Sequence, residues 1–299
     1  MSLTHVHLIP RNNQHPSSPP AHTHPPTYTH IHGRMWHAGV LQFCEMGPFI
    51  GFRTSTTDGA SWVEPVDPEG NELNVTNPLF AERAGHPVKL GAPHVVDHGP
   101  ENVNSPDGAL YMVGNGCLAD TLNSNCSWIS GDAVYLSRAG SYTAADPASL
   151  NNPRAWEFYC GGAGGAGGAC WTSDVAKARP ILKWEGRVGT VTATWHHELK
   201  RYLIVITTPT VLPSTVGPYD TWVLETPSLT AGPFALVSYM PRFGQQAYFV
   251  SFPSRFIGPP GSKEAVLAFS ANFACKTMGC HPNIHGATYG ANLLPIRFN

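Results

Sequence analysis

The run Val188-Gly-Thr-Val-Thr-Ala-Thr-Trp195 is followed, after a short polar turn, by a second apolar run, Tyr202-Leu-Ile-Val-Ile-Thr207. A third run covers Thr221–Thr226, and a fourth covers Phe234–Tyr239. Each run is rich in Val, Ile, Thr and aromatic residues and has the length of a β-strand. Four such runs in succession, separated by turn residues, predict a set of antiparallel strands.

The same rhythm continues on both sides of this stretch. Turn residues such as Pro106-Asp-Gly108 separate further short apolar runs. These runs cover Phe49–Phe52, Ala109–Val113, Ala133–Leu136, Ala247–Phe252, Ala265–Ser270 and Leu293–Phe298. Many short strands between turns favour a closed or repetitive all-β architecture. We therefore predict an all-β β-propeller of about five blades with a short or missing first blade, and a β-sandwich is the alternative.

The spacing of the runs groups them into blades. Blade material covers roughly residues 36–80, 88–160, 180–240 and 246–298. The repeats are not identical in sequence, so the propeller prediction depends on the rhythm of strands and not on a fixed period. Residues 1–32 differ from the rest, because they are rich in His and Pro and show no apolar periodicity. We expect a disordered tail over 1–32 and one propeller domain over 33–299.

The composition excludes several classes of protein. The 299 residues carry 18 Lys and Arg against 20 Asp and Glu, a formal net charge of -2, and no basic stripe. This balance argues against binding to nucleic acid. No run of about 18 apolar residues is present, so we expect no membrane-spanning segment. Charged residues make up only 13%, and the scarcity of Glu, Lys and Arg argues against a helical protein.

The cysteines and two short motifs indicate secretion. Three close pairs are expected to form disulfides, namely Cys117/Cys126, Cys160/Cys170 and Cys275/Cys280, and Cys44 is left over. Close pairs without a repeated C-x-x-C are typical of loops pinned by disulfides, although free thiols in a cytosolic protein remain an alternative. Asn74-Val-Thr76 and Asn125-Cys-Ser127 match the N-glycosylation acceptor pattern. We expect a secreted, disulfide-bonded glycoprotein.

The N-terminal segment does not fit secretion by itself. Residues Met1 to His15 contain no apolar core of the kind found in a signal peptide. We therefore expect that the natural start of a secreted chain is missing from, or wrongly joined to, this sequence.

Several motifs carry a resemblance to known families. Ser55-Thr-Thr-Asp-Gly-Ala-Ser-Trp62 resembles the Asp-box turn of sialidase-type propellers, with Thr57 where the usual Asp stands and Asp58 one place late. A longer resemblance includes Lys89-Leu-Gly-Ala-Pro-His94 and Gly217-Pro-Tyr-Asp-Thr-Trp222. These segments resemble a family of secreted microbial proteins that is itself similar to the five-bladed glycoside hydrolases of the arabinanase type. The resemblance implies a propeller fold and a carbohydrate substrate. It does not supply the catalytic base of the first blade.

Glycoside hydrolysis uses two carboxyl groups across the scissile bond, and in a propeller they lie at one end of the central channel. The densest candidate segment is Pro93-His-Val-Val-Asp-His-Gly-Pro-Glu101. Because strand residues alternate faces, one regular strand cannot direct both His94 and Asp97 into one site. If the strand ends near Val96, then Asp97, His98 and Glu101 lie at its rim. The candidate catalytic residues are Asp97, Glu101, Asp132 and Glu225, with Asp220 in support. For Asp97, a role limited to turn hydrogen bonds is an equal alternative.

Aromatic rings, amides and imidazoles near the same strands are candidates for sugar binding. They are His94, His98, Trp36, His37, Arg53, Tyr219, Gln246 and Tyr248. An Arg would matter most for a substrate that carries a carboxylate. Each of these residues could equally serve in packing.

The leading functional hypothesis is a glycoside hydrolase that acts on a polysaccharide or oligosaccharide through paired carboxylates. A polysaccharide lyase with His94, His98 or Tyr219 as base is one alternative, and a non-catalytic glycan-binding propeller is another. We expect a carbohydrate as the partner, no nucleic acid, no membrane and a monomer. No cofactor is expected; Ca²⁺ would suit an oxygen-rich rim, but no ligand spacing indicates it.

Overall fold

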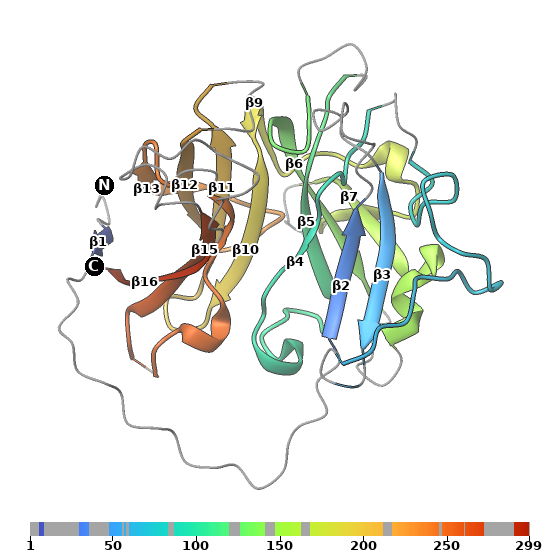
Figure 1. Cartoon of the computed structure of the whole chain (residues 1–299), viewed down its shortest axis with the longest axis horizontal. Helices are drawn as coiled ribbons and strands as arrows, with labels where there is room; N and C mark the ends of the chain where they lie inside the picture. Colours follow the sequence, from blue (N-terminus) through green and yellow to red (C-terminus); the bar gives the residue numbers. More distant parts are fainter. Residues whose placement is uncertain are drawn as a thin grey trace, which may run out of the picture.

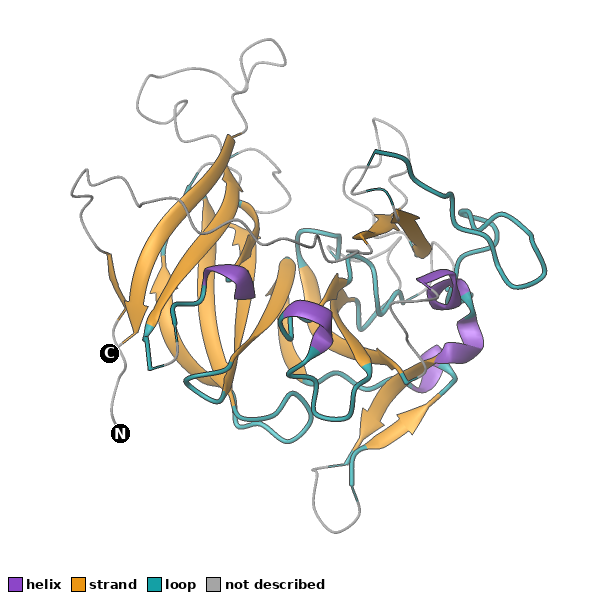
Figure 2. Ribbon diagram, turned by 90° about the horizontal axis from the view of Figure 1, so that it is seen from below, coloured by secondary structure: helices purple, strands orange, loops and turns teal. Residues whose placement is uncertain are grey.

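The computed structural model describes the chain in thirteen segments. They are residues 6–8, 30–35, 48–55, 57, 60–82, 87–119, 126–140, 147–162, 168–211, 217–244, 247–259, 261–271 and 290–298. Within them, strands form the body of the molecule, and helix is confined to single 3-10 turns (Figures 1 and 2). The all-β prediction is confirmed.

The strands form four antiparallel sheets. The first sheet is the hairpin of β2 (His30–Met35) and β3 (Phe49–Ser55). The second sheet has the order β4 (His94–Val95), β5 (Leu110–Gly116), β6 (Gly131–Ala139), β7 (Trp156–Gly161) and β8 (Cys170–Thr172), and β9 (Leu182–Val188) pairs with β6. The third sheet runs β10 (Thr190–His196), β11 (Arg201–Pro209), β12 (Tyr219–Thr226), β13 (Ala235–Met240). The fourth sheet runs β14 (Tyr248–Ser251), β15 (Glu264–Ala271), β16 (Gly290–Phe298), β1 (Val6–Leu8). The 3-10 turns are η1 (Pro100–Asn102), η2 (Pro147–Asn151), η3 (Pro153–Ala155), η4 (Val175–Lys177) and η5 (Ser254–Phe256).

The four sheets stack face to face, because their strands are apolar on both faces. In β11, Ile204 and Ile206 pack toward the second sheet, and Leu203 and Val205 pack toward the fourth. The second sheet is likewise buried on both sides, and its outer face packs on the first sheet through the stacked rings of Phe52 and Trp156. A stack of four sheets differs from the two layers of a β-sandwich. It matches consecutive blades of a propeller whose first blade is a short hairpin, but the described residues form four sheets, against about five predicted blades.

The first strands of the last three sheets converge. Asp97, just after β4, forms a parallel bridge with Thr194 of β10. Thr192 Oγ1 of β10 donates to Val250 O of β14 at 2.7 Å. In Figure 1, β4 and β10 lie next to each other near the middle of the molecule, with β11–β13 on one side and β5–β7 on the other. This is the position of the innermost strands in a propeller.

All ten predicted strands are present, and the predicted blades beginning at residues 88, 180 and 246 correspond to the last three sheets. Strands β7, β8 and β9 were not predicted, whereas β4 corresponds to the strand expected to end near Val96. The predicted blade of residues 180–240 wrongly included β9. This strand joins β6 of the preceding sheet through the pairs Ala133–Lys183 and Val134–Leu182. Its partner is set by packing across the sheets and not by its place in the chain.

Strand β1 and the start of β2 fall within or next to the segment for which we predicted no structure. The two ends of the chain meet in one sheet, since β1 pairs with β16. The rest of residues 1–29 lies outside the described residues, and the domain boundary near residue 33 stays a prediction.

Two of the predicted disulfides are present, Cys117–Cys126 and Cys160–Cys170. Cys275, Cys280 and Cys44 lie outside the described residues. The degenerate Asp box forms its turn through Thr57, whose Oγ1 accepts a hydrogen bond from Ser61 N at 2.9 Å. A hydroxyl therefore serves there as the turn acceptor. Asp58 lies outside the described residues.

Candidate functional site

A cleft of about 260 Å³ opens between the innermost strands β4, β10 and β14. We call it the central cleft. It is lined by His94, Val95, Asp97, Thr192, Ala193, Thr194, Phe249, Ser251 and Pro253. One carboxylate, one imidazole, three hydroxyls and one aromatic ring are thus gathered from three different sheets. This mixture of a few polar groups on an apolar frame is typical of a small-molecule site.

Asp97 reaches the central cleft because the chain changes its strand partner there. Val96 N still donates to Tyr111 O of β5 at 2.8 Å, whereas Asp97 N donates to Ala193 O of β10 at 2.9 Å. The regular strand β4 ends at Val95, so the alternation of faces is broken. As a result His94 and Asp97 line the same cleft, which one regular strand would have prevented. The alternative in which the strand ends near Val96 is the one that the structure bears out.

The Asp97 carboxylate is held by the main chain on two sides. Its Oδ1 accepts from Gly99 N at 2.9 Å, and its Oδ2 accepts from Ser254 N at 2.7 Å. The second bond joins the second sheet to the turn after β14. A carboxylate has about four lone-pair sites, so two bonds leave acceptor capacity for a ligand. Asp97 is thus a structural cross-link and an available acceptor at the same time.

Phe249 and His94 form the aromatic side of the central cleft. Their ring centroids are 5.0 Å apart with a tilt of 49°. Phe249 has a φ of 53°, in the left-handed region that a bulky residue rarely adopts. Backbone strain of this kind concentrates at ligand sites and persists only where the surroundings impose it. Here it places the Phe249 ring against His94.

The other predicted carboxylates do not lie in the central cleft. Glu101 is exposed on η1, with a φ of 53°. Asp132 closes a local network in which its two oxygens accept from Leu118 N and Gly186 N. Asp220 is buried at 4% exposure and accepts from Arg242 N at 2.8 Å. Glu225 is half-buried in β12, beside Leu203 of β11 and Ala235 of β13. The predicted catalytic pair is therefore not assembled from these residues in the central cleft.

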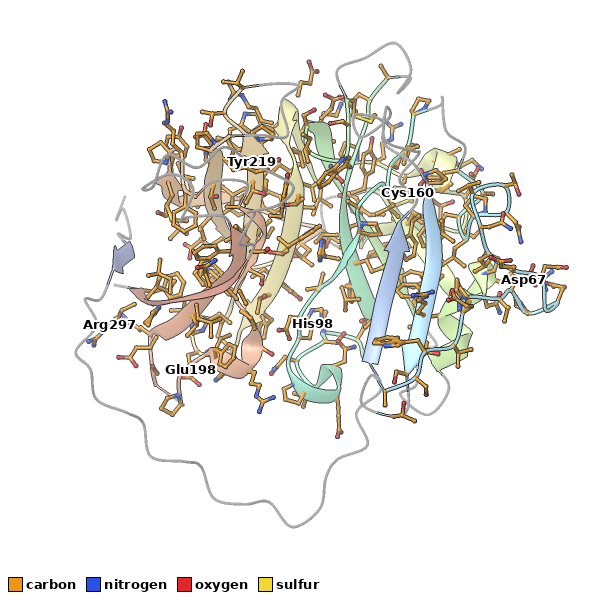
Figure 3. All side chains as sticks on the ribbon, in the orientation of Figure 1. Asp67, His98, Cys160, Glu198, Tyr219 and Arg297 are labelled. Carbon is orange, nitrogen blue, oxygen red and sulfur yellow. A yellow bond between two sulfur atoms is a disulfide. The ribbon has the colours of Figure 1, made fainter. Side chains whose placement is uncertain are left out.

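The predicted sugar-binding residues are spread over the molecule. Arg53 on β3 forms an exposed ion pair with Glu64, its Nε donating to Glu64 Oε2 at 2.9 Å. The ring centroids of Tyr219 and Tyr248 are 5.1 Å apart, and Tyr248 also packs against Trp128. In Figure 3, Tyr219 lies in the upper part of the view and His98 in the lower part. Trp36, His37 and Gln246 lie outside the described residues.

His98 does not line the central cleft but is buried beside Tyr202 and Tyr111. Its Nε2 lies 3.1 Å from the Tyr202 hydroxyl, and its exposed fraction is 1%. Burial lowers the pKa of His98 to about 4, against the weaker opposing influence of Asn102, Asp97 and Asp107. The imidazole is neutral at pH 7 and acts as a hydrogen-bonding partner in the core.

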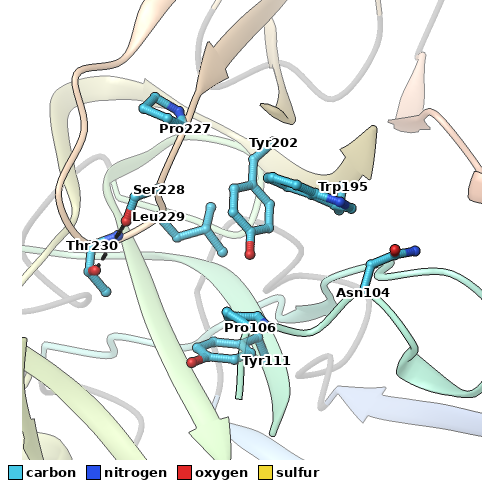
Figure 4. Close-up of a pocket in the computed structure, with 9 residues that line it drawn as sticks. All are labelled: Asn104, Pro106, Tyr111, Trp195, Tyr202, Pro227, Ser228, Leu229 and Thr230. Atoms are coloured by element: carbon cyan, nitrogen blue, oxygen red, sulfur yellow. Dashed lines mark hydrogen bonds between the residues drawn. The ribbon is translucent and has the colours of Figure 1, made fainter. Parts of the chain in front are cut away.

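A second cleft, of about 240 Å³, lies beside His98 between the second and third sheets (Figure 4). We call it the aromatic cleft. Its lining residues are Asn104, Pro106, Tyr111, Trp195, Tyr202, Pro227, Ser228, Leu229 and Thr230. None of them was predicted as a site residue. One signal was present: Trp195 and Tyr202 flank a predicted hairpin turn, and they pair directly across it in the structure.

The described residues hold no group of three or more His, Cys, Asp or Glu side chains that would bind a metal ion. In the part of the chain that the structure describes, no helix has the length and apolar character needed to cross a membrane.

Fold and site together define an all-β protein of stacked antiparallel sheets with two ligand-sized clefts. No protein-family model matches the chain, and no curated protein matches it. Among solved structures, it is similar to a crystal structure of an exo-β-1,3-galactanase from Phanerochaete chrysosporium with galactose. The match has 10% identity and a TM-score of 0.29, and it covers 85% of this chain and 54% of the galactanase chain. This chain therefore spans about half the length of that protein.

Proposed function

We propose that this chain binds a carbohydrate, with one sugar unit in the central cleft. The observation that carries the proposal is that Asp97, His94, three hydroxyl-bearing residues and Phe249 line one cleft, with the His94 ring packed against the ring of Phe249. A sugar ring presents hydroxyls at its edge and C–H groups on its faces. The carboxylate, imidazole and hydroxyls match the edge, and the aromatic ring matches a face.

Glycoside hydrolysis is the second candidate function, and Asp97 favours it. A carboxylate with remaining acceptor capacity can serve as a general base toward water. Hydrolysis by the usual route needs a second carboxyl group on the other side of the bond. Among the described residues that line the central cleft, Asp97 is the only carboxylate, and this is why binding takes precedence. Since the described lining also includes no Arg, nothing in it favours a lyase acting on uronates.

Secretion is part of the same proposal. The two short-loop disulfides, Cys117–Cys126 and Cys160–Cys170, form and persist in oxidising compartments. Carbohydrate polymers outside the cell would then be available to the clefts.

The proposal is tested with protein from an oxidising expression host. Neutral and uronic-acid oligosaccharides are titrated by calorimetry, and the same mixtures are analysed for products by mass spectrometry. His94→Ala should weaken binding at the central cleft at least tenfold, because it removes the imidazole and the ring that packs on Phe249. The matched control is His197→Ala, since His197 is half-buried and pairs with Glu198 outside both clefts.

Binding without product would establish the binding function. Products that have gained water would establish hydrolysis, and products that lack it a lyase. Equal affinity of wild type and His94→Ala for every saccharide would refute the assignment to the central cleft.

A further inference from the structure

We propose that the aromatic cleft is a second and separate binding site, which takes one ring of a neutral saccharide. This goes beyond the central cleft, because no residue lines both clefts. Thr192 and Thr194 line the central cleft, and Trp195 lines the aromatic cleft. Trp195 N donates to Asp97 O at 2.8 Å, so the segment around Asp97 lies between the two sites.

Three aromatic rings form the apolar surface of this cleft. Trp195 and Tyr202 are 4.8 Å apart at 61°, and Figure 4 shows Tyr111 across the cleft from Tyr202. Tyr111 and Tyr202 are almost fully buried, whereas Trp195 is only partly buried. Trp195 therefore offers an accessible ring against which a sugar face can stack.

The tyrosine rings are fixed before a ligand arrives. Tyr111 Oη donates to Asp107 Oδ2 at 2.9 Å, and Tyr202 Oη is 3.1 Å from His98 Nε2. His98 packs edge-on against both rings, with centroid distances of 5.6 Å. A site whose rings are already immobilised loses little conformational entropy on binding.

Polar groups stand at the edges of the cleft. Asn104 Nδ2 donates to His98 O at 2.9 Å, so that among the described residues its Oδ1 has no partner and can accept from a ligand hydroxyl. On the opposite side, Thr230 Oγ1 lies 3.3 Å from Ser228 Oγ (Figure 4). That turn is rigid, since Ser228 Oγ also accepts from Thr230 N and Ala231 N. One amide and two hydroxyls can thus orient a ring stacked on Trp195.

The charge of the lining defines the ligand class. None of the lining residues carries a charged side chain. The nearest carboxylate, Asp107, is bound by the Tyr111 hydroxyl and by Arg138 at 3.0 Å. Arg138 is also held by Glu157 and lies 4.1 Å above the Trp171 ring. Arg138 balances only one of these two carboxylates, so the group keeps a net negative charge. An uncharged sugar therefore suits the cleft better than a uronate or a phosphorylated ligand.

The experiment titrates the full chain by calorimetry with neutral gluco-, xylo-, manno- and galacto-hexasaccharides, and with a decaproline peptide as the rival aromatic-groove ligand. Trp195→Ala should weaken binding of at least one neutral hexasaccharide tenfold or more. Trp62→Ala, which removes an exposed Trp outside both clefts, is the matched control and should bind like wild type. Thr230→Val keeps the shape of the side chain, removes only the hydroxyl and should weaken binding severalfold. This second variant keeps the test valid if Trp195→Ala does not fold.

The outcomes separate the two clefts. Loss of hexasaccharide binding in Trp195→Ala and Thr230→Val, with retention in His94→Ala, supports the aromatic cleft even if the central cleft binds nothing. Loss in His94→Ala alone overturns the aromatic cleft and leaves the proposed function intact. Binding of decaproline in place of the saccharides overturns the proposal, and so does the absence of hexasaccharide binding by wild type.

Discussion

The two clefts share no lining residue and are built in different ways. The central cleft gathers short polar side chains from three sheets and contains a strained residue, Phe249. The aromatic cleft gathers rings and a rigid turn from two sheets, and its tyrosines are fixed by hydrogen bonds. The central cleft depends on how three sheets converge, and the aromatic cleft depends on how two neighbouring sheets pack. Substitutions should therefore affect them separately.

The largest effect is expected at Asp97, the cross-link beside the central cleft. Asp97→Ala leaves Gly99 N and Ser254 N without their acceptor. Hydrogen bonds to a charged group contribute about 1.5–3 kcal/mol each, or about 3–6 kcal/mol for two. Because Asp97 is only half-buried, water replaces part of the lost acceptor, and the free energy of unfolding should fall by about 2–4 kcal/mol. Urea unfolding followed by circular dichroism measures the change. Glu101→Gln, at an exposed site four residues away, should alter stability by less than about 0.5 kcal/mol. Equal effects of the two substitutions would contradict the cross-link.

Acid should destabilise the side of the molecule near the aromatic cleft through His98. Its folded pKa of about 4 lies below the ordinary value of 6.5, so between these pH values the unfolded chain binds more protons. The free energy of unfolding therefore rises as the pH increases from about 4 to 6.5. The stabilising contribution of neutral His98 is fully present above pH 6.5 and is lost as the pH falls toward 4. One group contributes at most about 1.4 kcal/mol per pH unit.

The measurement compares urea unfolding of wild type and His98→Gln from pH 4 to 7. Taking the difference cancels other titrating groups, such as His196, whose pKa burial also lowers to about 4, and Glu82, whose pKa burial raises to about 7. Wild type should lose stability more steeply than His98→Gln below pH 6.5. Parallel curves would show that His98 stays uncharged in both states or is not buried.

Tyr202→Phe should disturb the aromatic cleft alone. It removes the hydroxyl that is hydrogen-bonded to the buried His98 Nε2, at a cost of about 1–2 kcal/mol in the free energy of unfolding. Saccharide binding that depends on Trp195 should weaken, and binding that depends on His94 should not change. Calorimetric titrations of Tyr202→Phe and wild type provide the comparison. A loss at both clefts would mean that they are coupled through the Asp97–His98 segment.

The smallest effect is expected at Arg53, which pairs with Glu64 at the surface. Exposed ion pairs contribute little to stability, so Arg53→Gln should unfold like wild type. It should also bind every neutral and acidic saccharide like wild type, because Arg53 lies in neither cleft. Reduced binding of uronates alone would return Arg53 to the list of ligand-binding residues.

The sequence by itself determined the strands and the local cross-links. Alternating or continuous apolar runs located β5, β6 and β10–β16, because strand period and turn chemistry are local properties of the chain. The same holds for the disulfides Cys117–Cys126 and Cys160–Cys170, which close short loops. Asp97 and His94 were also selected from sequence, as polar residues that interrupt an apolar strand.

Only the tertiary structure decided what these residues do together. The change of partner at Val96 and Asp97, from β5 to β10, brings His94 and Asp97 into one cleft. The packing of the second sheet on the third brings Tyr111 to Trp195 and Tyr202, residues far apart in the chain. It also leaves Asp132, Asp220 and Glu225 in local main-chain or strand environments away from both clefts. Strand partners and sheet stacking are long-range choices set by burial of apolar faces, and a local pattern carries no record of them.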